Sequence, residues 1–232
     1  MKAIKSSLWF AGVALLAALS ACAPKPPPPA PPPPPVVVIP VTPRPIPPDN
    51  ASRFLVVPRA NAAGLRESVN RNISPAQTTW NLRSAYNVAA LNCSDAKHAE
   101  VLVNYRAFLS SHKRTLRAVN LKVDGEWRAR YGSGFVPYRE TFMTRVYNHF
   151  ALPPTLPALC DAVLVTSREA TTIKSSELEA FAFRTLPSIE VIYDDFYRRY
   201  EAYSVLAAAW DARYGGRAAP QVPPLALPSA AQ

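Results

Sequence analysis

Apolar side chains recur at alternating steps of four and three along two long stretches of the chain. The first stretch comprises His98, Leu102, Tyr105, Leu109, His112, Leu116, Val119 and Val123. The second comprises Ile189, Tyr193, Phe196, Tyr200, Tyr203, Ala207, Trp210 and Tyr214. This spacing lines up one face of a helix, and such a face is buried when it packs against other helices. The pattern therefore predicts two long helices that share a core.

The second of these faces is rich in aromatic rings and has two interpretations. It can belong to the core, or it can form a surface on which a sugar or another ligand stacks. Its helical spacing favours the core, where the tyrosine hydroxyls need hydrogen-bond partners or water.

Local signals place shorter helices before and between the two long stretches. Ser74 can cap, and Pro75 can begin, a helix that reaches about Leu91. Further helices are expected over about 138–150, 156–170 and 188–214. Helices of these lengths joined by short loops favour an all-α fold, an up-and-down helical bundle of four to six helices.

Two boundaries of this bundle stay open in the sequence. The first long helix opens near Ser94 and Asp95, but glycine at position 125 leaves open whether it continues to Tyr131. Before the helices, the apolar run 54–57 is either a lone extended segment or a piece of chain docked on the core. Both questions depend on how the segments pack in three dimensions, which the local sequence pattern does not decide.

The first twenty-odd residues have the anatomy of a signal peptide. Lys2 and Lys5 precede an apolar stretch over 8–19, and small residues follow. As a helix these twelve residues cover roughly 18 Å, which is too short for the roughly 30 Å core of a membrane. A permanent transmembrane helix is therefore the poorer interpretation.

The residues that close this stretch, Leu19, Ser20, Ala21 and Cys22, resemble the lipobox of bacterial lipoproteins. The resemblance implies cleavage before Cys22 and lipid on its sulfur, and the attached acyl chains would hold the protein to a membrane. Ala23 occupies the place where an aspartate often retains such proteins in the inner membrane, so the outer membrane is favoured, with the domain facing the periplasm. The alternative is an ordinary secretory signal with an incidental cysteine.

Proline is concentrated directly after this cysteine, with 15 of 26 prolines lying between Pro24 and Pro48. Proline lacks the amide donor, so the segment is expected to be an extended spacer, or alternatively a ligand for an aromatic groove of a partner. The predicted organisation is a signal peptide over 1–21, a lipidated cysteine and proline-rich tether over 22–52, a helical domain over 53–215 and a disordered tail over 216–232.

The charge balance favours an acidic partner. The formal net charge is +10, and removal of residues 1–21 with their two lysines leaves 10 − 2 = +8. A positive balance raises encounter rates with anionic lipids, polysaccharides and proteins. Nucleic acid is disfavoured because the chain is expected to leave the cytoplasm. The residues assigned to such binding, or alternatively to a solubilising face, are Arg114, Arg117, Arg128 and Arg130.

Two cysteines remain once Cys22 carries lipid. Cys93 and Cys160 form an even pair in an oxidising compartment, so a disulfide is expected, with two separate buried thiols as the alternative. His98 and His112 lie about 21 Å apart on one helix, so they cannot bind the same metal. Neither a metal nor a cofactor is implied by the sequence.

No pattern in the chain supports a particular reaction. Two serine and lysine pairs, Ser94 with Lys97 and Ser110 with Lys113, match an SxxK spacing, but the KTG element that accompanies it in penicillin-binding proteins is missing. The adjacent acids Asp194 and Asp195 point about 100° apart on a helix and cannot flank one bond. We therefore expect a binding or structural module for an envelope partner. The alternative is an envelope enzyme acting on cell-wall or lipid material.

Overall fold

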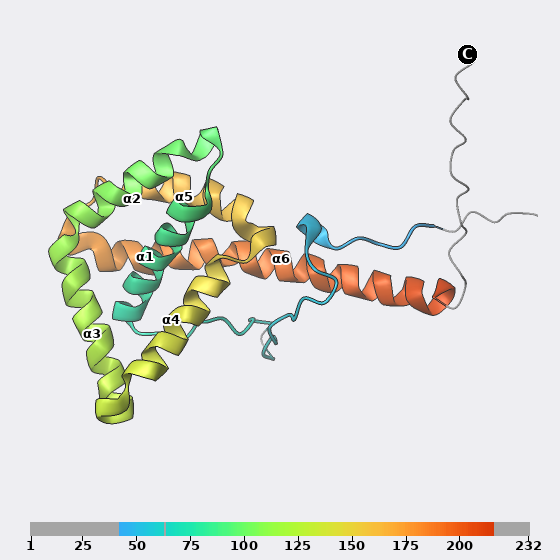
Figure 1. Cartoon of the computed structure of the whole chain (residues 1–232), viewed down its shortest axis with the longest axis horizontal. Helices are drawn as coiled ribbons and strands as arrows, with labels where there is room; N and C mark the ends of the chain where they lie inside the picture. The colour runs from blue at the N-terminus through green and yellow to red at the C-terminus, as the bar shows by residue number, and fades with distance from the viewer. Residues whose placement is uncertain (1–41, 63, 216–232) are drawn as a thin grey trace, which may run out of the picture. The chain divides into compact units, whose positions relative to one another are not determined.

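The computed structural model describes residues 42–62 and 64–215 (Figure 1). Six α-helices occur in these ranges: α1 Pro75–Asn92, α2 Ala99–Ser111, α3 Lys113–Tyr131, α4 Val136–Phe150, α5 Leu156–Ala170 and α6 Leu178–Tyr214. The described ranges contain no strand, only an isolated bridge between Ala60 and Arg66. The predicted all-α bundle is confirmed, with six helices.

Helix α1 lies at the centre of the bundle and contacts each of the other five α-helices (Figure 1). It begins as expected, with Pro75 in the first turn and the Ser74 side chain accepting from the amide of Gln77. Being enclosed, α1 buries polar residues as well as alanines, and the hydroxyls of Thr79 and Ser84 donate to its own backbone carbonyls. Those local bonds make their burial tolerable.

The first long apolar face is divided between two helices. Helix α2 ends at Ser111 and α3 begins at Lys113, with His112 out of helical geometry between them. The buried imidazole of His112 lies 3.1 Å from the carbonyl oxygen of Ala170 and 3.0 Å from Ser175 Oγ. The expectation of one continuous helix is therefore wrong at His112. At glycine 125 the helix does continue, and α3 ends only at Tyr131.

The last helix is longer than the sequence pattern predicts. It starts at Leu178 instead of Ser188 and carries Pro187 inside it. Pro187 is exposed, so its ring and the missing amide face solvent and not the core. The aromatic face is core over most of its length, because these residues are buried: Ile189, Tyr193, Phe196, Tyr200, Tyr203 and Ala207. Trp210 and Tyr214 are partly exposed.

The segment before the bundle packs along α6. Arg44 pairs with Asp211, and the Tyr200 hydroxyl donates to the carbonyl of Ser52 and accepts from the amide of Leu55. Among the described residues, those from Pro43 onward form one compact unit with the helices, so the ten residues 43–52 that were assigned to the tether belong to that unit. Of the run 54–57, residues 55 and 57 pack on the core while Phe54 is 91% exposed. Of the two alternatives for the run 54–57, the structure shows chain that is docked on the core.

A disulfide joins the end of α1 to α5. Cys93 and Cys160 are bonded, with their Cα atoms 5.6 Å apart, as predicted. The expected signal peptide, Cys22, the proline blocks up to position 41 and the tail lie outside the described residues. Among the described residues, no single helix is both long and apolar enough to cross a membrane; α4 and Pro153–Ala170 meet that test only as a pair bent by 50°.

Candidate functional site

A groove of about 580 Å³ lies where α1, α2 and α3 meet. We call it the cationic groove, and its lining residues are Trp80, Arg83, Leu109, Ser110, Lys113, Leu116, Arg117 and Asn120. The break at His112 turns the chain, so that the end of α2 and the start of α3 both border the groove. Helix α1 supplies Trp80 and Arg83 from one turn. The groove therefore combines apolar surface with three cations.

Its positive charge is not neutralised by acidic groups of the described chain. No carboxylate is among the lining residues, and neither Lys113 nor Arg117 makes an ion pair within the described ranges. Arg83 is held in place, because its Nη1 donates to the Tyr147 hydroxyl at 3.0 Å and its guanidinium lies 5.0 Å from the Trp80 ring centroid. A fixed arginine beside two unpaired cations suits an anionic ligand.

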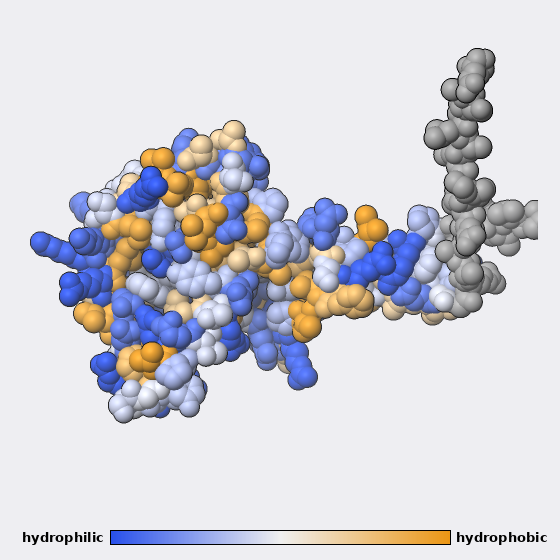
Figure 2. Space-filling view, viewed as in Figure 1, coloured by the Kyte–Doolittle hydropathy of each residue, from blue (hydrophilic) through white to orange (hydrophobic). Residues whose placement is uncertain are grey.

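The whole of α3 carries an excess of positive charge. It has six basic and two acidic residues. Both acids are engaged elsewhere, since Asp124 pairs with Arg139 of α4 and Glu126 accepts from the Ser74 hydroxyl. By contrast, arginines in other elements are neutralised by carboxylates: Arg44, Arg66, Arg71, Arg139, Arg168, Arg184, Arg198 and Arg199. Hydrophilic side chains project from the molecule along α3 (Figure 2).

The structure separates the four predicted arginines into two pairs. All four are exposed on α3. Arg114 and Arg117 lie near its start, and only Arg117 lines the cationic groove. Arg128 and Arg130 lie at its end, roughly 16 Å further along the axis, where their guanidinium groups contact aromatic rings. Four arginines that look alike in the sequence thus have two different surroundings.

The sequence pattern did not identify the other two charged residues of the groove, Arg83 and Lys113. Arg83 was overlooked because it belongs to a helix far away in the chain, and no local signal links it to α3. Lys113 was noted only for its spacing from Ser110, yet it stands four residues before Arg117, on the same side of a helix. This pair of like charges, four residues apart on one helix, was the sequence signal that could have indicated a cationic site.

A second polar cluster is built around Glu190 of α6. Its carboxylate accepts from Ser68 Oγ at 2.5 Å and from Asn70 Nδ2 at 2.7 Å, and it lies 2.8 Å from His149 Nε2 of α4. Asn81 of α1 donates to Asn70 and extends the network. Burial would raise the pKa of Glu190, but the contacts with His149, Ser68 and Asn70 outweigh burial and lower it.

This cluster is arranged to hold the fold together and not to activate a nucleophile. Ser68 is bonded to the carboxylate and not to the imidazole, so His149 is not placed to remove its proton. The lowered pKa of Glu190 makes that carboxylate a weak base. The network instead ties the loop before α1 to α4 and α6.

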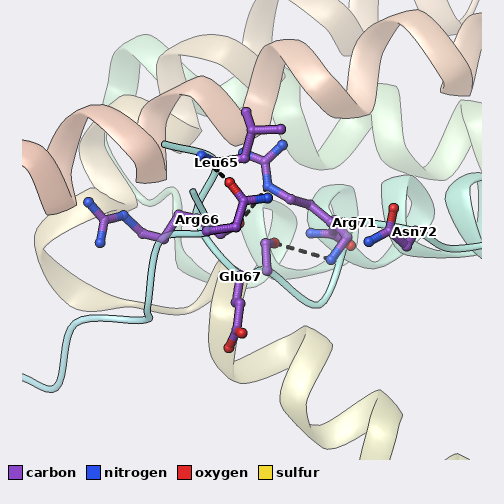
Figure 3. A pocket seen from close by; sticks show the side chains of 8 residues that line it. Leu65, Arg66, Glu67, Arg71 and Asn72 are labelled. Atoms are coloured by element: carbon purple, nitrogen blue, oxygen red, sulfur yellow. Dashed lines mark hydrogen bonds between the residues drawn. The ribbon is translucent and has the colours of Figure 1, made fainter. Parts of the chain in front are cut away.

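The pocket beside this loop offers no free charge to an anion. Its lining residues are Asn61, Leu65, Arg66, Glu67, Ser68, Asn70, Arg71 and Asn72. Figure 3 shows the Glu67 side chain pointing away from α6. Arg66 forms two bonds to Glu201, of 2.9 and 2.7 Å, and Arg71 pairs with Asp194 at 2.7 Å. Both arginines are therefore neutralised within the fold.

The SxxK pairs do not form a nucleophile site either. Lys97 pairs with Asp161 at 2.8 Å, and this contact, together with His98 Nε2 at 2.7 Å, lowers the pKa of Asp161. The buried His98 thus has a structural partner. Ser110 and Lys113 both border the cationic groove, but they lie on opposite sides of the helix break, and no hydrogen bond joins their side chains in the described structure.

Comparisons of the chain with protein-family models, with curated proteins and with solved structures found no match.

Proposed function

We propose that the protein is an envelope lipoprotein, anchored through lipid on Cys22, whose helical unit binds an acidic partner in the cell envelope. The observation that carries the binding role is the cationic groove, where Arg83, Lys113 and Arg117 lie beside apolar surface and no lining residue is acidic. The resemblance of residues 19–22 to a lipobox carries the anchoring role. The proline-rich segment between them would let the unit reach away from its membrane.

The groove favours binding over an envelope enzyme acting on cell-wall or lipid material. Neither a carboxylate nor an imidazole is among its lining residues, and the Lys113 amine has no hydrogen bond to the Ser110 hydroxyl in the described structure, so no activated nucleophile is in place there. Its exposed cations and broad opening suit a charged surface or polymer. Steering by such charges raises association rates, and the effect weakens as salt screens it.

Charge reversal in the groove tests this proposal. The mature chain with Cys22→Ser would be mixed with isolated envelopes and sedimented at increasing salt. We expect Lys113→Glu with Arg117→Glu to weaken binding at least about tenfold at low salt. The matched control is Arg59→Glu with Arg145→Glu, which makes the same change in net charge at exposed arginines without an ion pair in the described ranges.

The control decides between a site and a general charge effect. Little change in the control variant, with a large loss in the groove variant, supports the groove. Equal losses in both variants, or binding that responds to neither salt nor reversal, would contradict it.

A further inference from the structure

Helices α3 and α6 end in the same short segment. Residues 127–132 and 210–215 both read tryptophan, any residue, alanine, arginine, tyrosine, glycine. In each copy the arginine carbon Cζ lies 5.3 Å from the tyrosine ring centroid. The tryptophan and tyrosine centroids are 5.6 Å apart in α3 and 5.4 Å apart in α6. A basic residue in the last turn and a glycine beyond it are normal helix-ending signals.

The α3 copy has features that helix ending does not explain. Tyr138, from α4, stacks on Tyr131 with centroids 4.1 Å apart and planes 7° apart. The Trp127 ring is also stacked with Tyr131, with an interplanar angle of 14° between the two rings. Where α6 has Asp211, paired with Arg44, α3 has Arg128. We call Trp127, Tyr131 and Tyr138, with Arg128 and Arg130, the aromatic tip.

The aromatic tip is open to solvent. Helices α3 and α4 converge there, away from α1 and α5 (Figure 1). Tyr138 is 53% exposed although Tyr131 covers one face of its ring. In Figure 2 this end of the molecule shows mostly hydrophilic and intermediate residues around one small hydrophobic patch. A half-exposed tyrosine ring is thereby presented at the end of a hairpin that also carries Arg128 and Arg130.

One face of α3 runs from the cationic groove to the aromatic tip. At about 100° per residue, Lys113, Arg117, Arg128 and Tyr131 fall within about 60° of one another around the helix axis. Arg117 and Arg128 are roughly 16 Å apart along that axis. A polymer with charges repeated along its length can therefore contact both regions at once, whereas a small anion fills only one.

We infer that the acidic partner is a polysaccharide, with one sugar ring stacked on the aromatic tip and further anionic residues of the same strand in the cationic groove. An aromatic face binds the apolar C–H face of a sugar ring, and arginine donates paired hydrogen bonds to a carboxylate or phosphate. Insertion between lipid chains favours large aliphatic side chains, and within residues 127–138 Val136 is the one such residue that is exposed. The inference rests on the proposed function and names its ligand class.

Three soluble polymers separate the two contributions. Polygalacturonate carries both rings and carboxylates, polyglutamate carries carboxylates without sugar rings, and dextran carries rings without charge. Binding of the mature chain with Cys22→Ser would be measured for each at matched length. We expect polygalacturonate to bind about tenfold more tightly than polyglutamate, and dextran to bind weakly.

Tyr138→Ala should abolish the preference for polygalacturonate over polyglutamate and lower the melting temperature by no more than about 5 °C, because the ring is half exposed and the stack on Tyr131 is the contact that it loses. The matched control is Tyr214→Ala, at the end of α6, which should leave the preference intact. Equal binding of the two acidic polymers, or a preference that survives Tyr138→Ala, overturns the polysaccharide inference. So does tighter binding to anionic lipid vesicles than to polygalacturonate.

These outcomes are distinguishable from failure of the proposed function. Suppose that the groove variant loses envelope binding but the protein binds polygalacturonate and polyglutamate equally. The proposal of an acidic partner is then supported, and the inference that this partner is a polysaccharide is wrong. If the groove variant and its control bind envelopes equally, the proposed function falls first.

Discussion

His149 Nε2 lies 2.8 Å from Glu190 Oε1, and this contact joins α4 to α6 across the bundle. Both side chains are almost fully buried, and the His149 ring also packs on Tyr193, with ring centroids 4.1 Å apart. A buried carboxylate is costly unless it is paired and hydrogen-bonded. Here the partners come from α4 and from the loop before α1, so the network fixes those elements relative to α6.

The first prediction concerns this pair and pH. The folded pKa of Glu190 lies below its ordinary value of 4.5, so the carboxylate contributes stability above pH 4.5 that is lost as pH falls through the folded pKa. Glu190→Gln should lower the free energy of unfolding by about 3 kcal/mol at neutral pH and flatten its decline in acid. Urea unfolding from pH 7 to pH 3 measures both effects.

The exposed Glu179, also on α6, is the control for that experiment. Glu179→Gln should change stability by less than about 0.5 kcal/mol. If the free energy of unfolding of Glu190→Gln declined in acid as steeply as that of the unsubstituted protein, other carboxylates would be responsible for the pH dependence.

A second prediction concerns the disulfide. The bond between Cys93 and Cys160 closes a long loop, with a sequence separation of 67. In the chain-entropy model, replacing both with serine should cost about 4 kcal/mol, largely by freeing the unfolded chain. Unfolding by urea, with and without reductant, measures the loss. Reductant should not change the stability of the double variant. If reductant destabilised the double variant as much as the unsubstituted protein, the disulfide would not be the source of the reductant effect.

The third prediction concerns the junction between α2 and α3. His112→Ala removes the partner of the Ala170 carbonyl and of Ser175, and it leaves a gap in the core. We expect a loss of about 2 kcal/mol in the free energy of unfolding. Ser111→Ala, at the exposed neighbouring position, should have little effect. Because the junction shapes the cationic groove, His112→Ala should also weaken envelope binding; unchanged stability would contradict the structural role.

A fourth prediction concerns the proposed anchor. Cys22→Ser should release the protein from the membrane fraction, because the lipid attachment site is lost. Fractionation of cells, with intact-mass measurement of the unsubstituted protein, tests it. Cys93→Ser is the control and should leave the membrane association unchanged. An unmodified Cys22, or cleavage at another position, would refute the lipoprotein proposal.

The helices could be predicted from the sequence because their signals are local. The start of α1 follows from Ser74 and Pro75, and the buried face of α6 follows from a period of about 3.6 residues, which belongs to any helix. The pairing of Cys93 with Cys160 followed from simple counting under the expectation that Cys22 carries lipid. None of these depends on how the helices cross.

Only the tertiary structure decided where α2 ends, which arginines are neutralised and what surrounds the rest. His112 leaves the helix because Ala170 and Ser175, some sixty residues away, bind its ring. Arg83 meets Lys113 and Arg117 because α1 lies inside the bundle, and Tyr138 meets Tyr131 because α4 turns back along α3. Such contacts depend on helix crossing, which is set by packing over the whole core and leaves no periodic trace in the sequence.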